Sequence, residues 1–363
     1  MLLDSLPPTA VVPLSYSSTG TYIGIDVISG SSVYWDLELS SAPHLLVIGP
    51  SGSGKSVTLS ALVHRFVRSY NVNAIIFDIK DEYRYLFSIY TDRVLIFNPV
   101  EVPLPLCFCE DQPTKKLEMI NIAIESLSKV YTLSTQVRKY LAKILVNVCN
   151  RCLDVDSIWN YEVDVYDKEI SKATSTLTTL FNVYTNRYSF DEEFLGVYTS
   201  KQRRISIVNL KQIFVRDRLE SALVVTYILK YMLSTFNVSI TQIPINVVVL
   251  DELWHVLPFL GDEFVNMLAR YSRSLGIAMF MATQGVEDLH PHIDTIINSC
   301  GLFMAMSAPS ISYWQKLQRY LNLSKKAIDY AMSISGQGIA VARISPYKIP
   351  TILYVDPLDN FEE

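Results

Sequence analysis

The sequence is poor in charge and contains no long uninterrupted apolar run. Only 18% of its 363 residues are charged, and a net charge of −5 excludes a general basic coat, so a nucleic-acid partner would need a local basic lining. No stretch of about 18 uncharged apolar residues occurs, which predicts that no helix spans a membrane. Residues 1–8 contain no basic leader, so we expect no secretory signal and a cytoplasmic location.

The composition is nevertheless half apolar, and the mean hydropathy is +0.23. A chain with so few charges keeps apolar surface available for binding. We therefore expect contacts with other subunits or with a membrane-embedded partner protein. Any association with a membrane would pass through that partner.

Cysteine is also scarce, with five residues in the chain. Two close pairs, Cys107 with Cys109 and Cys149 with Cys152, could in principle supply four thiolates to zinc. The first pair follows a proline-broken loop that is expected to reach Leu106, and the second lies in a helical pattern. We therefore expect four buried apolar cysteines, with zinc as the less favoured alternative.

A glycine-rich segment near the start of the chain carries the strongest chemical signal. Residues 49–56 match G-x-x-x-x-G-K-[ST], with an apolar run at 45–48 before them and an amphipathic helical pattern after them. Glycine allows backbone angles closed to other residues, so successive N–H groups can surround a phosphate. The predicted nucleotide-binding residues are Gly49, Pro50, Ser51, Gly52, Ser53, Gly54, Lys55, Ser56 and Val57.

The end of this motif predicts both cofactors, ATP and Mg²⁺. Lys55 would reach the β- and γ-phosphates, and the hydroxyl of Ser56 would bind Mg²⁺. The helix that follows would direct its positive end at the nucleotide.

An apolar strand with acids at its end supplies the second half of the predicted site. Residues 246–250 run directly into Asp251 and Glu252. Asp251 would lie next to the Mg²⁺ held by Ser56. Glu252 could polarise a water aimed at the γ-phosphate. The combination predicts a Mg²⁺-dependent NTP hydrolase.

Three further polar residues are candidates for catalysis. Gln284 follows another apolar strand, and its amide could hydrogen-bond both the attacking water and the γ-phosphate. Arg270 and Arg273 stand three residues apart in the preceding helical pattern and are surface charges by default. In a ring of subunits, one of them could enter the neighbouring site and neutralise charge on the transferring phosphoryl group.

The order of the patterns predicts an α/β fold of the RecA-like P-loop type, with a mostly parallel sheet. An additional strand should lie between the P-loop strand and the acidic strand. Residues 1–43 indicate an N-terminal β-cap, 44–110 and 204–363 the two parts of the core, and 111–203 a helical insertion. A C-terminal β-hairpin should close one edge of the sheet.

Two smaller features have a structural and a functional interpretation. Asp78 and Glu82 follow the second core strand and could either cap a helix or contribute to the nucleotide site. The basic cluster at 201–204 could be a solvated strand entry or part of a track for a polyanion.

Taken in order, these motifs resemble the HerA/FtsK superfamily of ring-shaped DNA-pumping ATPases, and within it the HerA and conjugation branches. The resemblance covers roughly residues 20–355. The matching motifs lie at 44–56, 77–83, 250–255, 270–276, 282–284 and Asn298.

The resemblance implies a homohexamer with ATP bound between subunits. One arginine would act on the neighbouring subunit, and Arg273 fits the motif better than Arg270. The residues acting within one subunit would be Lys55, Ser56, Asp251, Glu252 and Gln284.

The resemblance leaves the cargo open between duplex DNA, single-stranded DNA and protein. We expect an ATP-driven DNA translocase acting in DNA transfer, import, packaging or processing. The alternative is a type IV secretion or pilus-assembly ATPase that moves protein. A third hypothesis is a nucleotide-binding scaffold without turnover.

Overall fold

The fold is centred on one large sheet whose middle is parallel. The computed structural model describes residues 19–88, 94–161, 167–186, 204–235, 246–270, 276–334, 336–347 and 349–357. Within them an 11-stranded sheet has the order β2-β1-β13-β12-β11-β3-β10-β9-β4-β8-β5. All neighbours from β11 to β5 pair in parallel. The mostly parallel α/β prediction is therefore confirmed.

The parallel strands carry the predicted P-loop and acidic segments. They are β3 (Leu45–Ile48), β4 (Asn73–Asp78), β5 (Val94–Phe97), β8 (Ile205–Asn209), β9 (Asn246–Leu250), β10 (Ile277–Thr283) and β11 (Leu302–Met306). Strand β10 lies between β3 and β9, so the predicted additional strand is present. Their carboxyl ends meet at one edge of the sheet, where open α/β folds bind ligands.

The parallel strands are continuous apolar runs because both faces of the sheet are covered. Successive side chains alternate between the faces, so Leu46 and Ile48 pack in one apolar core while Leu45 and Val47 pack in the other.

The antiparallel part of the sheet corrects one prediction. Strands β12 (Ile339–Ile344) and β13 (Thr351–Tyr354) form the expected hairpin, but β13 also pairs with β1 (Thr21–Asp26), and β1 pairs with β2 (Ser32–Trp35). The hairpin therefore does not close the sheet, because the N-terminal ribbon continues it. The strands at the two edges are β2 and β5.

Helices cover both faces. On one face lie α1 (Lys55–Tyr70) and the short α2 (Tyr83–Leu86), and Leu59, Phe66 and Tyr83 join the core there. On the other lie α7 (Lys211–Arg216), α8 (Arg218–Thr235), α9 (Leu257–Arg270), α10 (Ile293–Asn298), α11 (Ile311–Leu321) and α12 (Lys325–Ser333). Within the residues described, no helix combines the length and apolar character needed to cross a bilayer.

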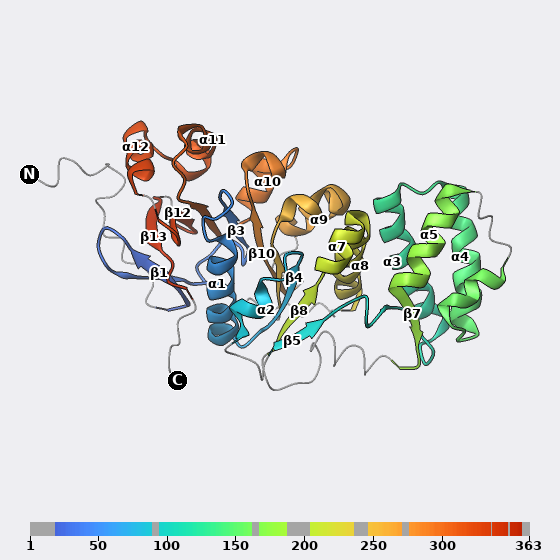
Figure 1. Ribbon diagram of the computed structural model, residues 1–363. Helices are drawn as coiled ribbons and strands as arrows, with labels where there is room; N and C mark the ends of the chain where they lie inside the picture. Colours follow the sequence, from blue (N-terminus) through green and yellow to red (C-terminus); the bar gives the residue numbers. More distant parts are fainter. Residues whose placement is uncertain are drawn as a thin grey trace, which may run out of the picture.

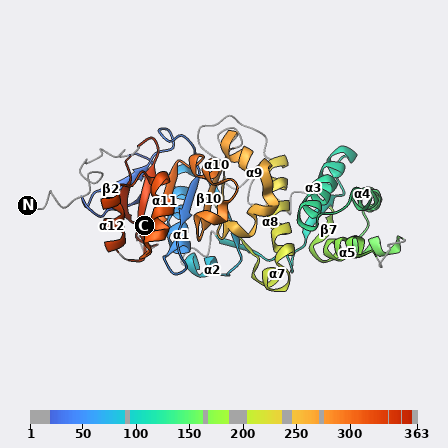
Figure 2. The same cartoon turned by 90° about the horizontal axis from the view of Figure 1, so that it is seen from above.

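A largely helical region lies at one end of the molecule (Figures 1 and 2). We call residues 104–161 and 167–184 the α3–α5 region. It contains β6 (Leu104–Phe108), α3 (Pro113–Tyr131), α4 (Thr135–Asn150), a 3-10 helix (Val155–Asn160), α5 (Lys168–Leu180) and β7 (Phe181–Tyr184). The predicted proline-broken loop up to Leu106 is wrong at its end, because β6 pairs in parallel with β7 outside the main sheet. Pro105 is tolerated because a pair of strands has free edges.

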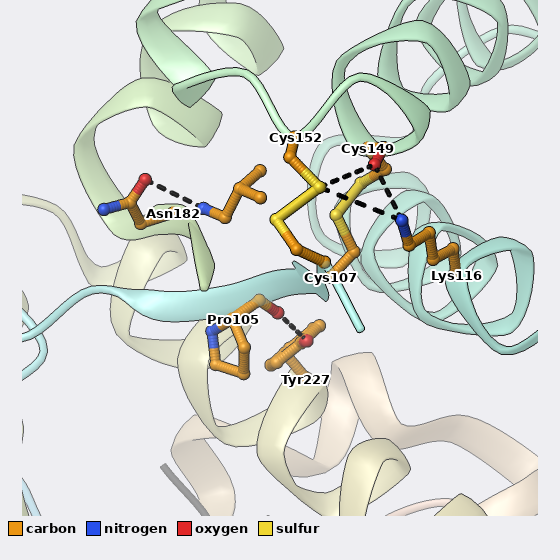
Figure 3. The surroundings of a disulfide bond; sticks show 9 residues. Pro105, Cys107, Lys116, Cys149, Cys152, Asn182 and Tyr227 are labelled. Carbon is orange, nitrogen blue, oxygen red and sulfur yellow. Dashed lines mark hydrogen bonds between the residues drawn. A yellow bond between two sulfur atoms is a disulfide. The ribbon is translucent and has the colours of Figure 1, made fainter. Parts of the chain in front are cut away.

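The four cysteines of this region form disulfides, which corrects the expectation of unpaired buried thiols. Cys107 is bonded to Cys149 and Cys109 to Cys152 (Figure 3). Cys107 lies in β6 and Cys109 directly follows that strand, so the two cysteines are two residues apart and both can meet the C-terminal end of α4. Nearby, the Nζ of Lys116 donates to the carbonyl of Cys149 at 3.2 Å. The two bonds tie the end of β6 and the residue after it to the last turn of α4 and the residues just after that helix.

Candidate functional site

The glycine-rich segment forms a tight turn between β3 and α1. Gly52 and Gly54 have φ angles of +80° and +94°, in the left-handed region that favours glycine. At Gly49 a side-chain carbon would lie 2.6 Å from the Cβ of Met306, so only glycine fits there. Helix α1 begins at Lys55, directly after the turn. The backbone N–H groups at this end of α1 can bind an anion.

Lys55 lies over the turn from which it comes. Its Nζ donates to the carbonyl oxygens of Gly49 at 2.8 Å and Pro50 at 3.0 Å. Burial lowers the pKa of Lys55, and the carboxylates of Glu252 and Asp251 oppose that shift. An anionic phosphate would favour the charged form further, since opposite charges stabilise each other.

The turn and the acidic strand meet, although they are far apart in the sequence. The hydroxyl of Ser56 donates to Oδ2 of Asp251 at 2.7 Å, and the hydroxyl of Tyr83 donates to the same oxygen at 3.1 Å. Burial raises the pKa of Asp251 although both hydrogen bonds lower it, and the charge of Glu252 adds to the rise. A buried carboxylate of this kind is stabilised by a nearby cation.

The donor atoms at this point fit Mg²⁺ and phosphate. Mg²⁺ prefers oxygen ligands, and the Ser56 hydroxyl and the Asp251 carboxylate supply them side by side. The hydroxyl of Ser53, within the turn, is buried and has no hydrogen-bond partner among the described residues. A phosphate in the turn would satisfy such a donor.

Glu252 is held by three side chains. Its Oε1 accepts a hydrogen bond from the ammonium of Lys80, and the pair forms an ion pair. Its Oε2 accepts from the indole Nε1 of Trp254 at 2.6 Å and from the amide of Gln284 at 3.3 Å. Burial alone would raise the pKa of Glu252, but these partners, Lys80 foremost, hold it below its usual value. Glu252 is therefore an ionised carboxylate whose two oxygens are both engaged.

Asp78 was expected either to cap a helix or to contribute to the nucleotide site. In the structure it caps the turn after β4. Its carboxylate accepts from the backbone N–H groups of Lys80 at 3.0 Å, Asp81 at 2.7 Å and Tyr83 at 2.9 Å. This turn directs Lys80 and Tyr83 toward the acidic pair. Glu82 makes no side-chain capping hydrogen bond.

The structure brings most of the predicted site residues together and leaves some apart. Ser56 contacts Asp251, Gln284 contacts the adjacent Glu252, and Lys55 lies over the same turn, where both carboxylates affect its pKa. Ser51 and Val57 are exposed.

The structure describes the two predicted arginines and the basic cluster only in part. Arg270 ends α9 and its side chain is not described, while Arg273 lies outside the described residues. Of the basic cluster at 201–204, residues 201–203 also lie outside, and Arg204 precedes β8 directly.

Sequence reasoning missed four residues at the site. The first three are Lys80, Tyr83 and Trp254, which contact the acidic pair. They lie within the motifs at 77–83 and 250–255 that resemble the family. The proximity of Lys80 and Tyr83 to the acidic pair needs the parallel pairing of β4 with β9. The fourth, Gln337, lies in the turn before β12, and its amide donates to the carbonyl of Gly52 at 3.4 Å. No local signal links that turn to the P-loop.

The turn, the acidic strand and the sheet order together define the fold of the P-loop ATPases. The family model described as helicase HerA, central domain, matches residues 23–232, more than half of the chain. The chain therefore belongs to the HerA central-domain family, and the predicted resemblance is confirmed.

A curated relative is the DNA import protein CedB of Sulfolobus acidocaldarius. The identity is 23% over 349 residues, which is 93% of this chain and 56% of CedB. The chain thus spans little more than half the length of this relative.

Two solved structures share this fold. VirB4 of Thermoanaerobacter pseudethanolicus has a TM-score of 0.65 at 14% identity, covering 94% of this chain and 97% of VirB4. The bacterial conjugative coupling protein TrwB, in its unbound form, has a TM-score of 0.62 at 12% identity, covering 94% and 90%. At such low identity the likeness shows the fold.

Proposed function

We propose that this protein is an ATP-hydrolysing ring motor that translocates DNA. The observation that carries the proposal is the contact of Ser56, at the end of the P-loop, with Asp251, next to Glu252. These residues supply a phosphate-binding turn, two oxygen ligands for a cation and a carboxylate that can act as a base.

Each of these residues has a separate role in hydrolysis. The backbone N–H groups of the turn and Lys55 would bind the phosphates, while Ser56 and Asp251 would hold Mg²⁺. Bound Mg²⁺ would neutralise charge on the β- and γ-phosphates. Glu252 accepts a proton from the attacking water, and Gln284, beside it, orients that water. An arginine from the neighbouring subunit of a homohexamer, Arg273 or Arg270, completes the site.

The support for ATP and Mg²⁺ combines the donor set with a structural neighbour. TrwB has been solved with ADP and Mg²⁺ bound, at a TM-score of 0.62 and 13% identity. The oxygen donors of Ser56 and Asp251 suit the same cation.

The support for DNA as cargo is the family together with the curated relative, CedB, which is described as a DNA import protein. The net charge of −5 means that DNA would follow a local basic lining rather than a general field. A membrane-embedded partner protein would anchor the ring where transfer crosses a membrane.

The decisive experiment measures ATP hydrolysis with duplex DNA, with single-stranded DNA and without DNA. The sample is the full chain, and its assembly into rings is checked by particle imaging. We expect stimulation by one form of DNA, and no hydrolysis by the Lys55→Ala variant in the same preparation. Hydrolysis that DNA leaves unchanged would favour a protein cargo. Nucleotide binding without any hydrolysis would favour a scaffold.

A further inference from the structure

Lys80 is the residue that most restricts the candidate base. It pairs with Oε1 of Glu252, whereas Trp254 and Gln284 engage Oε2. A general base needs a free lone pair at the oxygen that takes the proton of water. Three of the roughly four lone-pair sites of the Glu252 carboxylate are thus engaged, and the remaining one lies on Oε1, the oxygen that Lys80 occupies. Departure of Lys80 therefore leaves Oε1 free for the attacking water.

Of the three partners, Gln284 is also exposed, but only Lys80 carries a positive charge that an arriving anion can attract. The side chain of Lys80 is 40% exposed, whereas the side chain of Glu252 is only 1% exposed. Lysine is a compact charge on a flexible stem, so the ammonium can swing while Glu252 stays in place.

A phosphate is the group able to draw Lys80 away. Partial burial alone would lower the pKa of Lys80, but the hydrogen bond and charges of Glu252 and Asp251 raise it, so the ammonium stays charged. Its partner Glu252 directly follows Asp251, and Asp251 contacts Ser56, the residue after Lys55, so Lys80 is paired at the border of the phosphate-binding turn. A γ-phosphate bound near Lys55 therefore competes with Glu252 for Lys80.

We propose that Lys80 is a positioning residue that holds Glu252 before nucleotide binds and moves to the γ-phosphate when a triphosphate binds. The inference rests on the proposed function, because it needs a nucleotide in the P-loop. It makes the release of the base depend on the third phosphate, so a diphosphate leaves Glu252 paired.

The first test compares the affinities for ATPγS and ADP in the wild type and in Lys80→Met. Loss of one charge-assisted hydrogen bond to the γ-phosphate should weaken ATPγS binding by about 10-fold, with ADP binding changed less than about 2-fold. Lys80→Arg should keep most of the preference for ATPγS. The matched control is Lys211→Met, since Lys211 is 54% exposed and pairs with Asp81 rather than with Glu252.

The second test follows the surroundings of Glu252 by the fluorescence of Trp254, whose indole donates a hydrogen bond to the Glu252 carboxylate. ATPγS should change the tryptophan emission of the wild type, ADP should not, and Trp254→Phe should remove the change. Lys80→Met without nucleotide should already resemble the ATPγS-bound wild type. This readout does not move if Lys80 only stabilises the fold.

Equal weakening of ATPγS and ADP, or the same emission change with both, overturns the role of Lys80. Failure of the proposed function gives a different result, because then the wild type binds neither nucleotide or is not stimulated by DNA. If the wild type binds and hydrolyses ATP and Lys80→Met keeps the full preference for ATPγS, the role of Lys80 is contradicted while the proposed function stands.

Discussion

The carboxyl edge of the parallel sheet and the α3–α5 region are held together in different ways. At the edge, charged and polar side chains from the segments that follow β3, β4, β9 and β10 meet through hydrogen bonds and ion pairs. In the α3–α5 region, two disulfides join β6 to α4 over an apolar core. Noncovalent contacts can exchange partners when a ligand arrives, whereas covalent bonds cannot. The comparison therefore separates a region that can rearrange from one whose shape is fixed.

The largest effect should come from removing the ammonium of Lys55. Lys55→Ala deletes the side chain that pairs with the phosphates, so ATP binding should fall by at least about 100-fold and hydrolysis with it. Isothermal titration with ATP and a hydrolysis assay measure both. The α3–α5 region should stay as protected from hydrogen exchange as in the wild type. A variant that binds ATP normally would place the nucleotide elsewhere.

Next in size is the loss of the base. Glu252→Gln keeps the shape of the side chain and removes its ability to take a proton, so turnover should fall by roughly 10²- to 10⁴-fold. ATP binding should remain, because the P-loop is intact. Single-turnover hydrolysis and titration with ATP separate the two properties. Turnover within a few fold of the wild type would exclude Glu252 as the base.

Removing the disulfides should destabilise the α3–α5 region. The two bonds span separations of 42 and 43 residues and so close almost the same loop. Either bond alone should supply most of the stabilisation, so Cys109→Ala with Cys152→Ala should cost little. Replacing all four cysteines by alanine should lower the local stability by about 4 kcal/mol, the chain-entropy value for such a loop.

Hydrogen exchange of α4 amides measures that local stability. ATP affinity should stay unchanged, since the nucleotide site lies at the carboxyl edge of the sheet and not in the α3–α5 region. Equal losses from the two-cysteine and four-cysteine variants would contradict the shared-loop explanation.

The predictability of the two regions differs for a physical reason. The P-loop and the strand ending in Asp251 carry local patterns, and a parallel sheet brings the ends of neighbouring strands together. The contact of Ser56 with Asp251 could therefore be anticipated from the sequence. The mostly parallel sheet and its additional strand followed from the same patterns.

What could not be anticipated depends on long-range pairing. The helical spacing predicted α3, α4 and α5, but nothing local indicates that β6 pairs with β7. The disulfides depend on the packing of β6 against the end of α4, so cysteine spacing alone left both free thiols and zinc open. The position of the N-terminal ribbon beyond β13 is likewise set by contacts between the two ends of the chain.

The smallest effect should come from one hydroxyl. Tyr83→Phe removes the 3.1 Å hydrogen bond to Asp251, while the ring keeps its stacking on Phe87 and Ser56 still donates to the same carboxylate. Loss of one hydrogen bond is worth about 1 kcal/mol, so the affinity for Mg²⁺-ATP should fall by roughly 5-fold. The matched control is Tyr131→Phe, which removes a 3.1 Å hydrogen bond to Thr176 in the α3–α5 region. Titration with Mg²⁺-ATP should detect the first change and not the second, and an equal response of both variants would mean that the two regions are not separate in function.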